Sequence, residues 1–276
     1  MEDSIKAGNG LTRRHLLAGA ALAAGAGLAL PAPAIAQNAR KTFVLVHGAW
    51  HGGWCWKYVR DILEQNGHRV FTPTMTGLGM YSHMLTPEVD MNTHIQDIEN
   101  LFHWEDLENV TLVGHSYAGW VCSGALETVE KQVGSLVMVD AFLPVDGSSA
   151  YDTNKPEQQV NLDKLRAEGV LKRPAPPARA FVKTEENIAW VDAKMTPQPL
   201  AAVFTPISLT GARERIAKKM FIRALGFAQP AFQANYEATS ADPSWETYGV
   251  PADQSSHDIM VDAPELLAKL IEENAA

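Results

Sequence analysis

Short apolar runs typical of buried strands alternate along this chain with segments of helical periodicity. The runs are four to six residues long, and most of them are rich in β-branched residues. They lie at 42–46, 68–72, 110–113, 135–140, 220–225 and 245–250. Helical patterns lie between or after them at 54–65, 95–102, 117–129 and 262–273, the last opening with a capping box at Asp262–Glu265. This alternation predicts the α/β fold class, a mostly parallel sheet with helices on both faces.

The composition of the chain excludes several classes of function. With 46% apolar and 20% charged residues, the chain resembles an ordinary core-forming domain. A formal charge of −9 and the lack of a basic run argue against a nucleic-acid partner. Cys55 and Cys122 are too few for a disulfide scaffold or a four-cysteine zinc site, and their apolar neighbours favour buried thiols. We therefore expect an enzyme.

The first 36 residues have the pattern of an export signal. Arg13-Arg14 precede an apolar run at 16–30, which is shorter than the roughly 20 residues that a spanning helix needs. Ala34-Ile35-Ala36 then offers the small-x-small step that a signal peptidase cleaves. The segment resembles a twin-arginine (Tat-type) signal, which implies periplasmic or secreted protein from a bacterium, with no stable membrane anchor. An amphipathic or core helix is the alternative, but the run has no polar face.

Within the remaining domain, 37–276, regular alternation fails at about 144–212. Eight prolines fall in this stretch, and its helical patterns are scattered. A structureless insertion of that length is uncommon in a compact domain. We interpret the stretch as a small cap that folds over a functional site.

A strand-to-helix turn carries the clearest chemical signal, in Gly114-His115-Ser116-Tyr117-Ala118-Gly119. A serine on such a turn is pushed outward, and small neighbours let the strand and the helix approach. The N–H groups at the start of the helix suit a developing oxyanion. The usual pattern is G-x-S-x-G, whereas here Ala118 takes the fifth position and Gly119 follows. The turn predicts Ser116 as a nucleophile and Tyr117 N–H as an oxyanion donor; an ordinary glycine-rich turn is the alternative.

A base must accompany the serine, and His257 has the expected place. It follows the short strand at 245–250 and precedes the last helix, as in the chain order serine, acid, histidine. The other histidines of the domain are His47, His51 and His115 in motif loops, and His68, His83, His94 and His103 in surface-like surroundings. His47 and His51 are four residues apart but lie in a glycine-rich loop without a third ligand, so we expect no metal. No residues suggest a cofactor either.

Three motifs carry a family resemblance: HGAWHGGW at 47–54, GHSYAG at 114–119 and SHD at 256–258. Together they resemble the α/β-hydrolase superfamily, most of all its branch of plant methylesterases, hydroxynitrile lyases, and small bacterial carboxylesterases and carbamate hydrolases. The resemblance covers nearly all of 41–275. It implies the α/β-hydrolase fold and an oxyanion hole made by the backbone N–H groups of Ala49 and Tyr117. Trp50 and Gly48 are the candidates for the substrate pocket, although Trp50 fits a core position equally well; Trp54 and Trp56 are expected in the core.

The leading functional reading is a serine hydrolase of carboxylic esters, or carbamates, of a hydrophobic small molecule, with an acyl-enzyme on Ser116. Hydroxynitrile lyase chemistry is a related alternative. Those lyases carry threonine where this chain has Gly48 and lysine where it has Asp258, and both departures count against it. A ligand receptor with slow turnover on a hydrolase fold is the alternative from a different class.

A carboxylate must complete a catalytic triad with Ser116 and His257, and its position in this chain differs from that in the plant branch. In the plant branch the acid follows the strand after the cap. That strand is expected here at 220–225, yet no Asp or Glu occurs from 216 to 236. Asp140 ends the strand after the nucleophile helix, which resembles the arrangement in pancreatic-type lipases and some haloalkane dehalogenases. A carboxylate that ends an apolar strand is costly without a partner. We predict Asp140 as the acid, with Asp146, Asp253 and Asp258 as alternatives. The non-catalytic alternative is that Asp140 caps the first turn of the cap.

Overall fold

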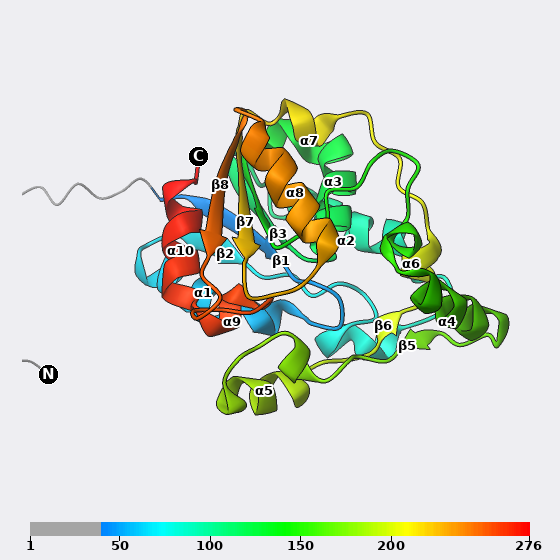
Figure 1. Cartoon of the computed structure of the whole chain (residues 1–276). Helices are drawn as coiled ribbons and strands as arrows, with labels where there is room; N and C mark the ends of the chain where they lie inside the picture. The colour runs from blue at the N-terminus through cyan, green and yellow to red at the C-terminus, as the bar shows by residue number, and fades with distance from the viewer. Residues whose placement is uncertain (1–39) are drawn as a thin grey trace, which may run out of the picture. The chain divides into compact units, whose positions relative to one another are not determined.

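The computed structural model describes residues 40–276 (Figure 1). The predicted export signal lies outside the described residues. Within this described part, the model contains no helix whose length and apolar character would let it cross a membrane.

Six parallel strands form the central sheet, in the order β2-β1-β3-β4-β7-β8. Their bounds are Thr42–Val46 (β1), Arg69–Phe71 (β2), Val110–His115 (β3), Val133–Val139 (β4), Lys218–Ala224 (β7) and Trp245–Val250 (β8). The central strands are continuous apolar runs because both of their faces are covered. The predicted α/β class with a mostly parallel sheet is confirmed.

Successive residues of each strand point to opposite faces, so the sheet builds two cores. In β1, Val44 and Val46 belong to the core that contains residues of α2 (Met91–Trp104) and α3 (Ala118–Val129). Phe43 and Leu45 belong to the opposite core, with α1 (Lys57–Gln65), α9 (Ile259–Asp262) and α10 (Pro264–Glu273). A further helix, α8 (Pro230–Ala241), packs on β7 and β8 and crosses in front of them in Figure 1.

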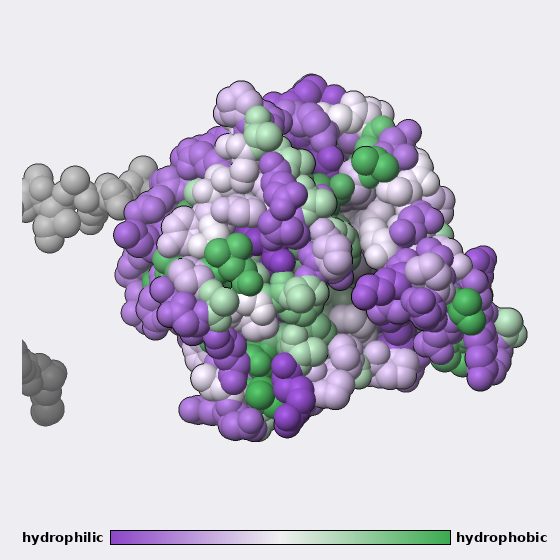
Figure 2. Space-filling view, viewed as in Figure 1, coloured by the Kyte–Doolittle hydropathy of each residue, from purple (hydrophilic) through white to green (hydrophobic). Residues whose placement is uncertain are grey.

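The segment between β4 and β7 contains one helix of 12 residues, α4 (Pro156–Ala167), and otherwise only short elements. The short elements are η4 (Ala150–Thr153), β5 (Lys172–Arg173), η5 (Ala178–Ala180), α5 (Glu185–Asp192), β6 (Gln198–Pro199), α6 (Ala201–Phe204) and α7 (Ala212–Arg215). All but α7 gather beyond the carboxyl ends of the strands (Figure 1). The part that contains α4 forms a hydrophilic lobe, while apolar side chains gather nearer the centre of the same face (Figure 2).

Several local expectations need correction. The helix expected at 54–65 is divided into η1 (Gly53–Trp56) and α1, and α8 was not predicted. The predicted capping box at Asp262 does not form, because Ala263 precedes α10 and the Asp262 carboxylate instead accepts from Ser256 N and Lys183 N. The remaining short helices are η2 (Gly79–Met84) and η3 (Glu130–Gln132). The prediction of buried thiols is confirmed, since Cys55 and Cys122 are both buried and free.

Candidate active site

Ser116 occupies a tight turn between β3 and α3. Its φ is 54°, in the left-handed region that few residues other than glycine adopt. The Ser116 carbonyl accepts from Gly119 N at 3.0 Å and from Phe142 N at 3.2 Å. A Cβ at Gly119 would lie 1.9 Å from the Phe142 carbonyl oxygen. Glycine one place later than in the usual motif is therefore a steric requirement of this turn.

His257 reaches the serine from the loop between β8 and α9. Its Nε2 lies 2.9 Å from Ser116 Oγ, and its Nδ1 lies 2.6 Å from Asp140 Oδ2. Because a carboxylate only accepts, Nδ1–H donates to Asp140 and Nε2 is left to accept the serine proton. Phe227 and Phe232 stack on the imidazole, with ring centroids 4.4 and 5.4 Å away. The structure thus aligns a hydroxyl, an imidazole and a carboxylate.

Asp140 is fully buried directly after β4, and its carboxylate has partners on both oxygens. Oδ1 accepts from Arg223 Nη1 at 2.6 Å and from Ala224 N at 3.1 Å, which leaves Oδ2 to His257. The other carboxylates considered have different surroundings: Asp146 accepts from Leu209 N, Asp253 is exposed, and Asp258 bonds His51. Of the four, Asp140 is the one whose carboxylate hydrogen-bonds the His257 ring.

The N–H groups of Ala49 and Tyr117 are free of hydrogen bonds to the described residues, and both residues line the same cavity as Ser116. His47 holds the first of these peptides from behind. Its Nδ1–H donates to the Gly48 carbonyl at 2.8 Å, while its Nε2 accepts from Met75 N at 3.1 Å. Both bonds require a neutral ring, and burial lowers the pKa of His47 to about 3. Since C=O and N–H of one planar peptide point in opposite directions, His47 fixes the direction of Ala49 N–H.

A buried ion pair supports the next peptide of this loop. His51 Nδ1 lies 2.7 Å from the Ala49 carbonyl oxygen, and Nε2 lies 3.0 Å from Asp258 Oδ2. Both ring nitrogens face acceptors, so both carry protons and the ring is cationic. Burial acts to lower the pKa of His51, but the charge and hydrogen bond of Asp258 outweigh it and raise that pKa. The pKa of Asp258 falls to about 2 in spite of its own burial, because His51 stabilises the carboxylate.

The expected surface-like surroundings of His68 and His94 are wrong, because both side chains are buried. His94 Nε2–H donates to the Thr76 carbonyl at 2.9 Å, so Nδ1 accepts from the Tyr117 hydroxyl at 2.9 Å. This bond anchors the side chain of Tyr117, the residue that directly follows Ser116. Only the packing of α2 on α3 brings these two residues together, and no local pattern announces it.

A cavity of about 420 Å³ opens at Ser116. Its aromatic lining consists of Trp50, Tyr117, Phe142, Phe181, Phe227 and Phe232. Polar side chains from the segment between β4 and β7 complete the wall, among them Asn154, Gln158, Arg173 and Gln198. The cavity therefore suits an apolar or aromatic molecule with a few polar groups.

Of the two residues expected in the substrate pocket, one lines the cavity and the other does not. Trp50 lines the cavity, whereas Gly48 does not, and the expectation for Gly48 is wrong. Gly48 packs against the Ser116 turn, where a Cβ would be 2.8 Å from His115 Nδ1 and 3.0 Å from Ser116 Cβ. Trp56 is buried in the core, and Trp54 is partly buried against that core.

One buried cluster has the composition of a metal site. His115, His257 and Asp258 bring ligand-type atoms within 4.8 Å of one another. Both ring nitrogens of His257 already bond Asp140 and Ser116, and Asp258 bonds His51. A metal here would have to break these bonds, so the arrangement fits proton transfer better than metal binding.

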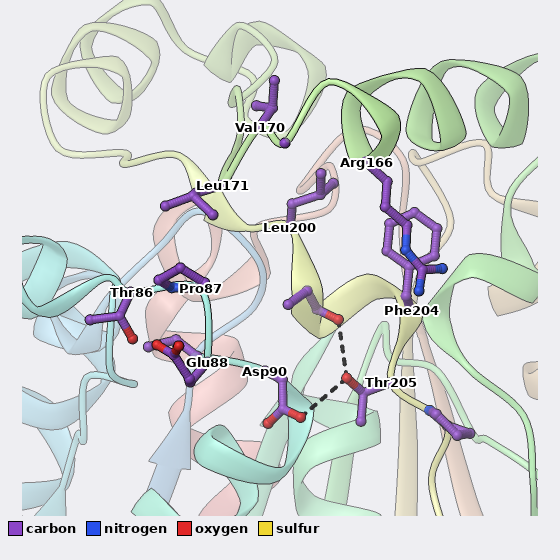
Figure 3. Close-up of a pocket in the computed structure, with 14 residues that line it drawn as sticks. Thr86, Pro87, Glu88, Asp90, Arg166, Val170, Leu171, Leu200, Phe204 and Thr205 are labelled. Atoms are coloured by element: carbon purple, nitrogen blue, oxygen red, sulfur yellow. Dashed lines mark hydrogen bonds between the residues drawn. The ribbon is translucent and has the colours of Figure 1, made fainter.

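A second cavity of about 420 Å³ lies between the loop before α2 and the α4–α6 region (Figure 3). Thr205 Oγ1 lies 3.1 Å from the Ala201 carbonyl oxygen and 3.4 Å from Asp90 Oδ2. The Arg166 guanidinium lies 4.6 Å from the centre of the Phe204 ring. Among the described residues, none that lines it has a buried polar side-chain atom without a partner. This cavity shows no reactive group.

Comparisons with known proteins identify the family to which a chain of this fold belongs. A profile described as the alpha/beta hydrolase family matches residues 43–270. The carbendazim hydrolyzing esterase of Nocardioides sp. is 35% identical over 240 residues, which cover 82% of this chain and 96% of the relative. Putative methylesterase 11 of Arabidopsis thaliana is 23% identical over 84% of this chain and 63% of its own length. An extracellular alpha/beta-hydrolase from a Paenibacillus species superposes with a TM-score of 0.74 at 22% identity, covering 85% of this chain and 99% of that one. The chain belongs to the alpha/beta hydrolase family, among hydrolases of the esterase type.

Proposed function

We propose that this protein hydrolyses carboxylic esters of hydrophobic small molecules, carbamates included, through an acyl-enzyme on Ser116. The observation that carries the proposal is the continuous contact from Ser116 Oγ through His257 to Asp140, at 2.9 and 2.6 Å, where the aromatic cavity opens. The catalytic roles given below belong to this proposal.

In the first step, Ser116 Oγ attacks the carbonyl carbon while His257 Nε2 takes the hydroxyl proton. The Asp140 carboxylate stabilises the imidazolium and holds its tautomer. The oxyanion accepts from the N–H groups of Ala49 and Tyr117. His257 then gives its proton to the departing alcohol or amine, which leaves an ester between Ser116 and the acyl group. Water, deprotonated by His257, attacks that ester and releases the acid and Ser116.

The class of substrate follows from the lining and from the names of relatives. Six aromatic side chains line the cavity, so an apolar or aromatic portion of the substrate is accommodated well. One relative is named for the hydrolysis of carbendazim, and others are named methylesterases. Both points support a small, largely apolar ester or carbamate.

Two observations weigh against lyase chemistry at this site. Gly48 has no room for the threonine of the hydroxynitrile lyases, because its Cβ would meet His115 and Ser116. Asp258 is fully buried in the ion pair with His51 and cannot serve as the lysine does in those lyases. Rapid turnover of p-nitrophenyl butyrate would in turn separate an esterase from a receptor with slow turnover.

A panel of aryl, benzyl and methyl esters with matched carbamates tests the proposal. Saturable hydrolysis of at least one class, lost in Ser116→Ala, supports it. Equal hydrolysis by Ser116→Ala and the parent protein contradicts it.

We also propose that the protein is exported through a twin-arginine signal and that its mature form begins near Gln37. Arg13-Arg14 and the short apolar run that follows support this location. Intact-mass measurement of the protein from a bacterial host should find the N-terminus near Gln37 in the periplasmic or secreted fraction. Arg13→Lys combined with Arg14→Lys should block export. An uncleaved N-terminus in the cytoplasmic fraction would refute the assignment.

A further inference from the structure

Two polar residues of the segment between β4 and β7 lie side by side in the wall of the cavity that opens at Ser116. Arg173 in β5 and Gln198 in β6 are direct partners in a two-stranded antiparallel ladder. Opposite residues of such a pair place their side chains on the same face, with Cβ atoms about 4.5–5.5 Å apart. Both residues line the cavity that opens at Ser116.

The amide of Gln198 has one half bonded and one half free. Its Oε1 accepts from Trp50 N at 3.0 Å. Because a backbone N–H can only donate, the amide oxygen must face Trp50, and this settles which end of the amide is which. Its Nε2 is then a donor that is buried with no hydrogen-bond partner among the described residues, and the side chain is only 1% exposed.

Arg173 is a half-buried cation that forms no ion pair or hydrogen bond through its guanidinium within the described part of the chain. The guanidinium lies 4.9 Å from the centre of the Trp50 ring, and Trp50 in turn stacks on Phe181 at 5.8 Å. Burial lowers the pKa of Arg173 from its ordinary value, as expected for a cation that has lost water without gaining a counter-ion.

The Trp50 indole adds a third donor to this wall. Its Nε1–H is buried and also lacks a partner among the residues that the structure describes. A buried donor without an acceptor is costly, and where the residue lines a cavity a ligand can supply the acceptor. Two such donors, on Trp50 and Gln198, therefore belong to residues that line the cavity, and the half-buried Arg173 guanidinium belongs to a third.

We propose that this wall, formed by Trp50, Arg173 and Gln198, binds a hydrogen-bond acceptor on the substrate, with a carboxylate favoured over a neutral carbonyl because Arg173 is charged. The inference rests on the proposed ester hydrolysis and makes it more specific: the substrate joins its ester or carbamate to a part that carries an acceptor. The rings of Trp50 and Phe181 contact the apolar portion that connects the two.

The substrate wall is also tied to the oxyanion loop. The Trp50 backbone, with a φ of 64°, is hydrogen-bonded on both sides to the segment between β4 and β7. Gln198 Oε1 accepts from Trp50 N, and Thr196 N donates to the Trp50 carbonyl at 2.9 Å. A ligand bound to Gln198 Nε2 would therefore contact the same side chain that accepts from Trp50 N, next to Ala49 in the chain.

Three benzyl acetates with substituents of similar size test the proposal: 4-carboxybenzyl, 4-acetylbenzyl and 4-isopropylbenzyl acetate, together with their meta isomers. The methylene group keeps the electronic effect of the substituent away from the ester. Charge-assisted hydrogen bonds predict a kcat/KM at least about 10-fold higher for the carboxyl ester than for the isopropyl ester, with the acetyl ester between them. Equal values for the three esters would overturn the proposal.

Variants assign the preference to residues. In Arg173→Met the ratio of carboxyl to isopropyl ester should fall to about one. In Gln198→Glu the acceptor for Trp50 N remains, but a carboxylate now neighbours Arg173, so the ratio should fall below one. Lys172→Met is the matched control, because it removes the same charge from the adjacent, exposed position of β5 and should keep the parent ratio. A ratio that survives Arg173→Met would contradict the assignment.

Failure of the inference is distinguishable from failure of the proposed function. If no ester is hydrolysed, calorimetric titration of Ser116→Ala with the carboxyl and isopropyl esters still tests the wall. Tighter binding of the carboxyl ester, lost when Arg173→Met is added, supports the acceptor site. Equal affinities overturn it.

Discussion

Arg223 donates from Nη1 to Asp140 Oδ1 over 2.6 Å, and both side chains are buried. Asp140 follows β4, and Arg223 lies in β7, which pairs with β4. Arg223 also donates to the carbonyls of Ala224 and Phe227. The strand that carries the acid in the plant branch here contributes a cation, which holds an acid supplied by the neighbouring strand. This contact leaves Asp140 Oδ2 for His257.

Replacing the acid should abolish most turnover without removing the nucleophile. Asp140→Asn favours the wrong tautomer of His257, and we expect kcat to fall by about 10⁴. Steady-state kinetics with p-nitrophenyl butyrate measures the change, and circular dichroism checks that the variant is folded. Asp146→Asn serves as the control and should retain near-normal kcat. The opposite pattern would move the acid to Asp146.

Arg223 should contribute to stability through its contact with Asp140. Arg223→Met leaves the carboxylate buried beside an apolar side chain, and breaking such a pair costs about 3 kcal/mol of unfolding free energy. Urea unfolding of Arg223→Met, Asp140→Asn and the double variant gives their coupling energy. We expect a coupling above about 1 kcal/mol for groups in direct contact. A coupling near zero would show that the two side chains contribute independently.

Gly48→Thr should damage the esterase without creating a lyase. The added side chain would meet Ser116 Cβ and His115 Nδ1, so either the oxyanion loop or the nucleophile must shift. A shift of about 1 Å in a catalytic group costs on the order of 10²-fold in rate. The measurements are kcat/KM for p-nitrophenyl butyrate and release of benzaldehyde from mandelonitrile. Full esterase activity, or a clear gain of mandelonitrile cleavage, would contradict this reading of the loop.

The His51–Asp258 pair should make stability depend on pH in a defined direction. The pKa of His51 is raised from 6.5, so its contribution is complete below pH 6.5 and is lost as pH rises through the higher folded-state value. The pKa of Asp258 is lowered from 3.8 to about 2, so its contribution is complete above pH 3.8 and is lost as pH falls toward 2.

Asp258→Asn isolates this effect. Near pH 6 the variant should be less stable by about 3 kcal/mol, because His51 loses its buried counter-ion. As pH rises through the raised pKa of His51, the difference from the parent protein should shrink. Urea unfolding from pH 6 to 9 measures both curves, and a difference that stays constant over this range would contradict the assigned charge state.

The sequence predicted the elements whose pattern is local. The strands β1 and β8 have the expected bounds, because both combine β-branched or aromatic residues with clear turn signals at their ends. The tight turn at Ser116 was also predictable, since Ser116 and Gly119 belong to one short contiguous motif. The capping box at Asp262 failed although it is local, because Ser256 and Lys183 compete successfully for the same carboxylate.

The hydrogen bonds that hold the site residues in place were not predictable from local sequence patterns. His94 meets Tyr117, and Gln198 meets Trp50, only through packing of segments that are 23 and 148 residues apart. Arg223 left one usable signal: it is a charged residue within the apolar run MFIRAL, and a buried charge requires a partner. That signal indicates a nearby carboxylate, but the sheet order that selects Asp140 is a property of the fold.

The central claim is that Ser116 is the nucleophile, and covalent labelling tests it most directly. A fluorophosphonate should add one label to the parent protein, located on Ser116 by peptide mass spectrometry, with loss of esterase activity in proportion to labelling. Ser116→Ala should take up no label and hydrolyse no ester. Undiminished labelling of Ser116→Ala, or a label found on a different residue of the parent protein, would contradict the account.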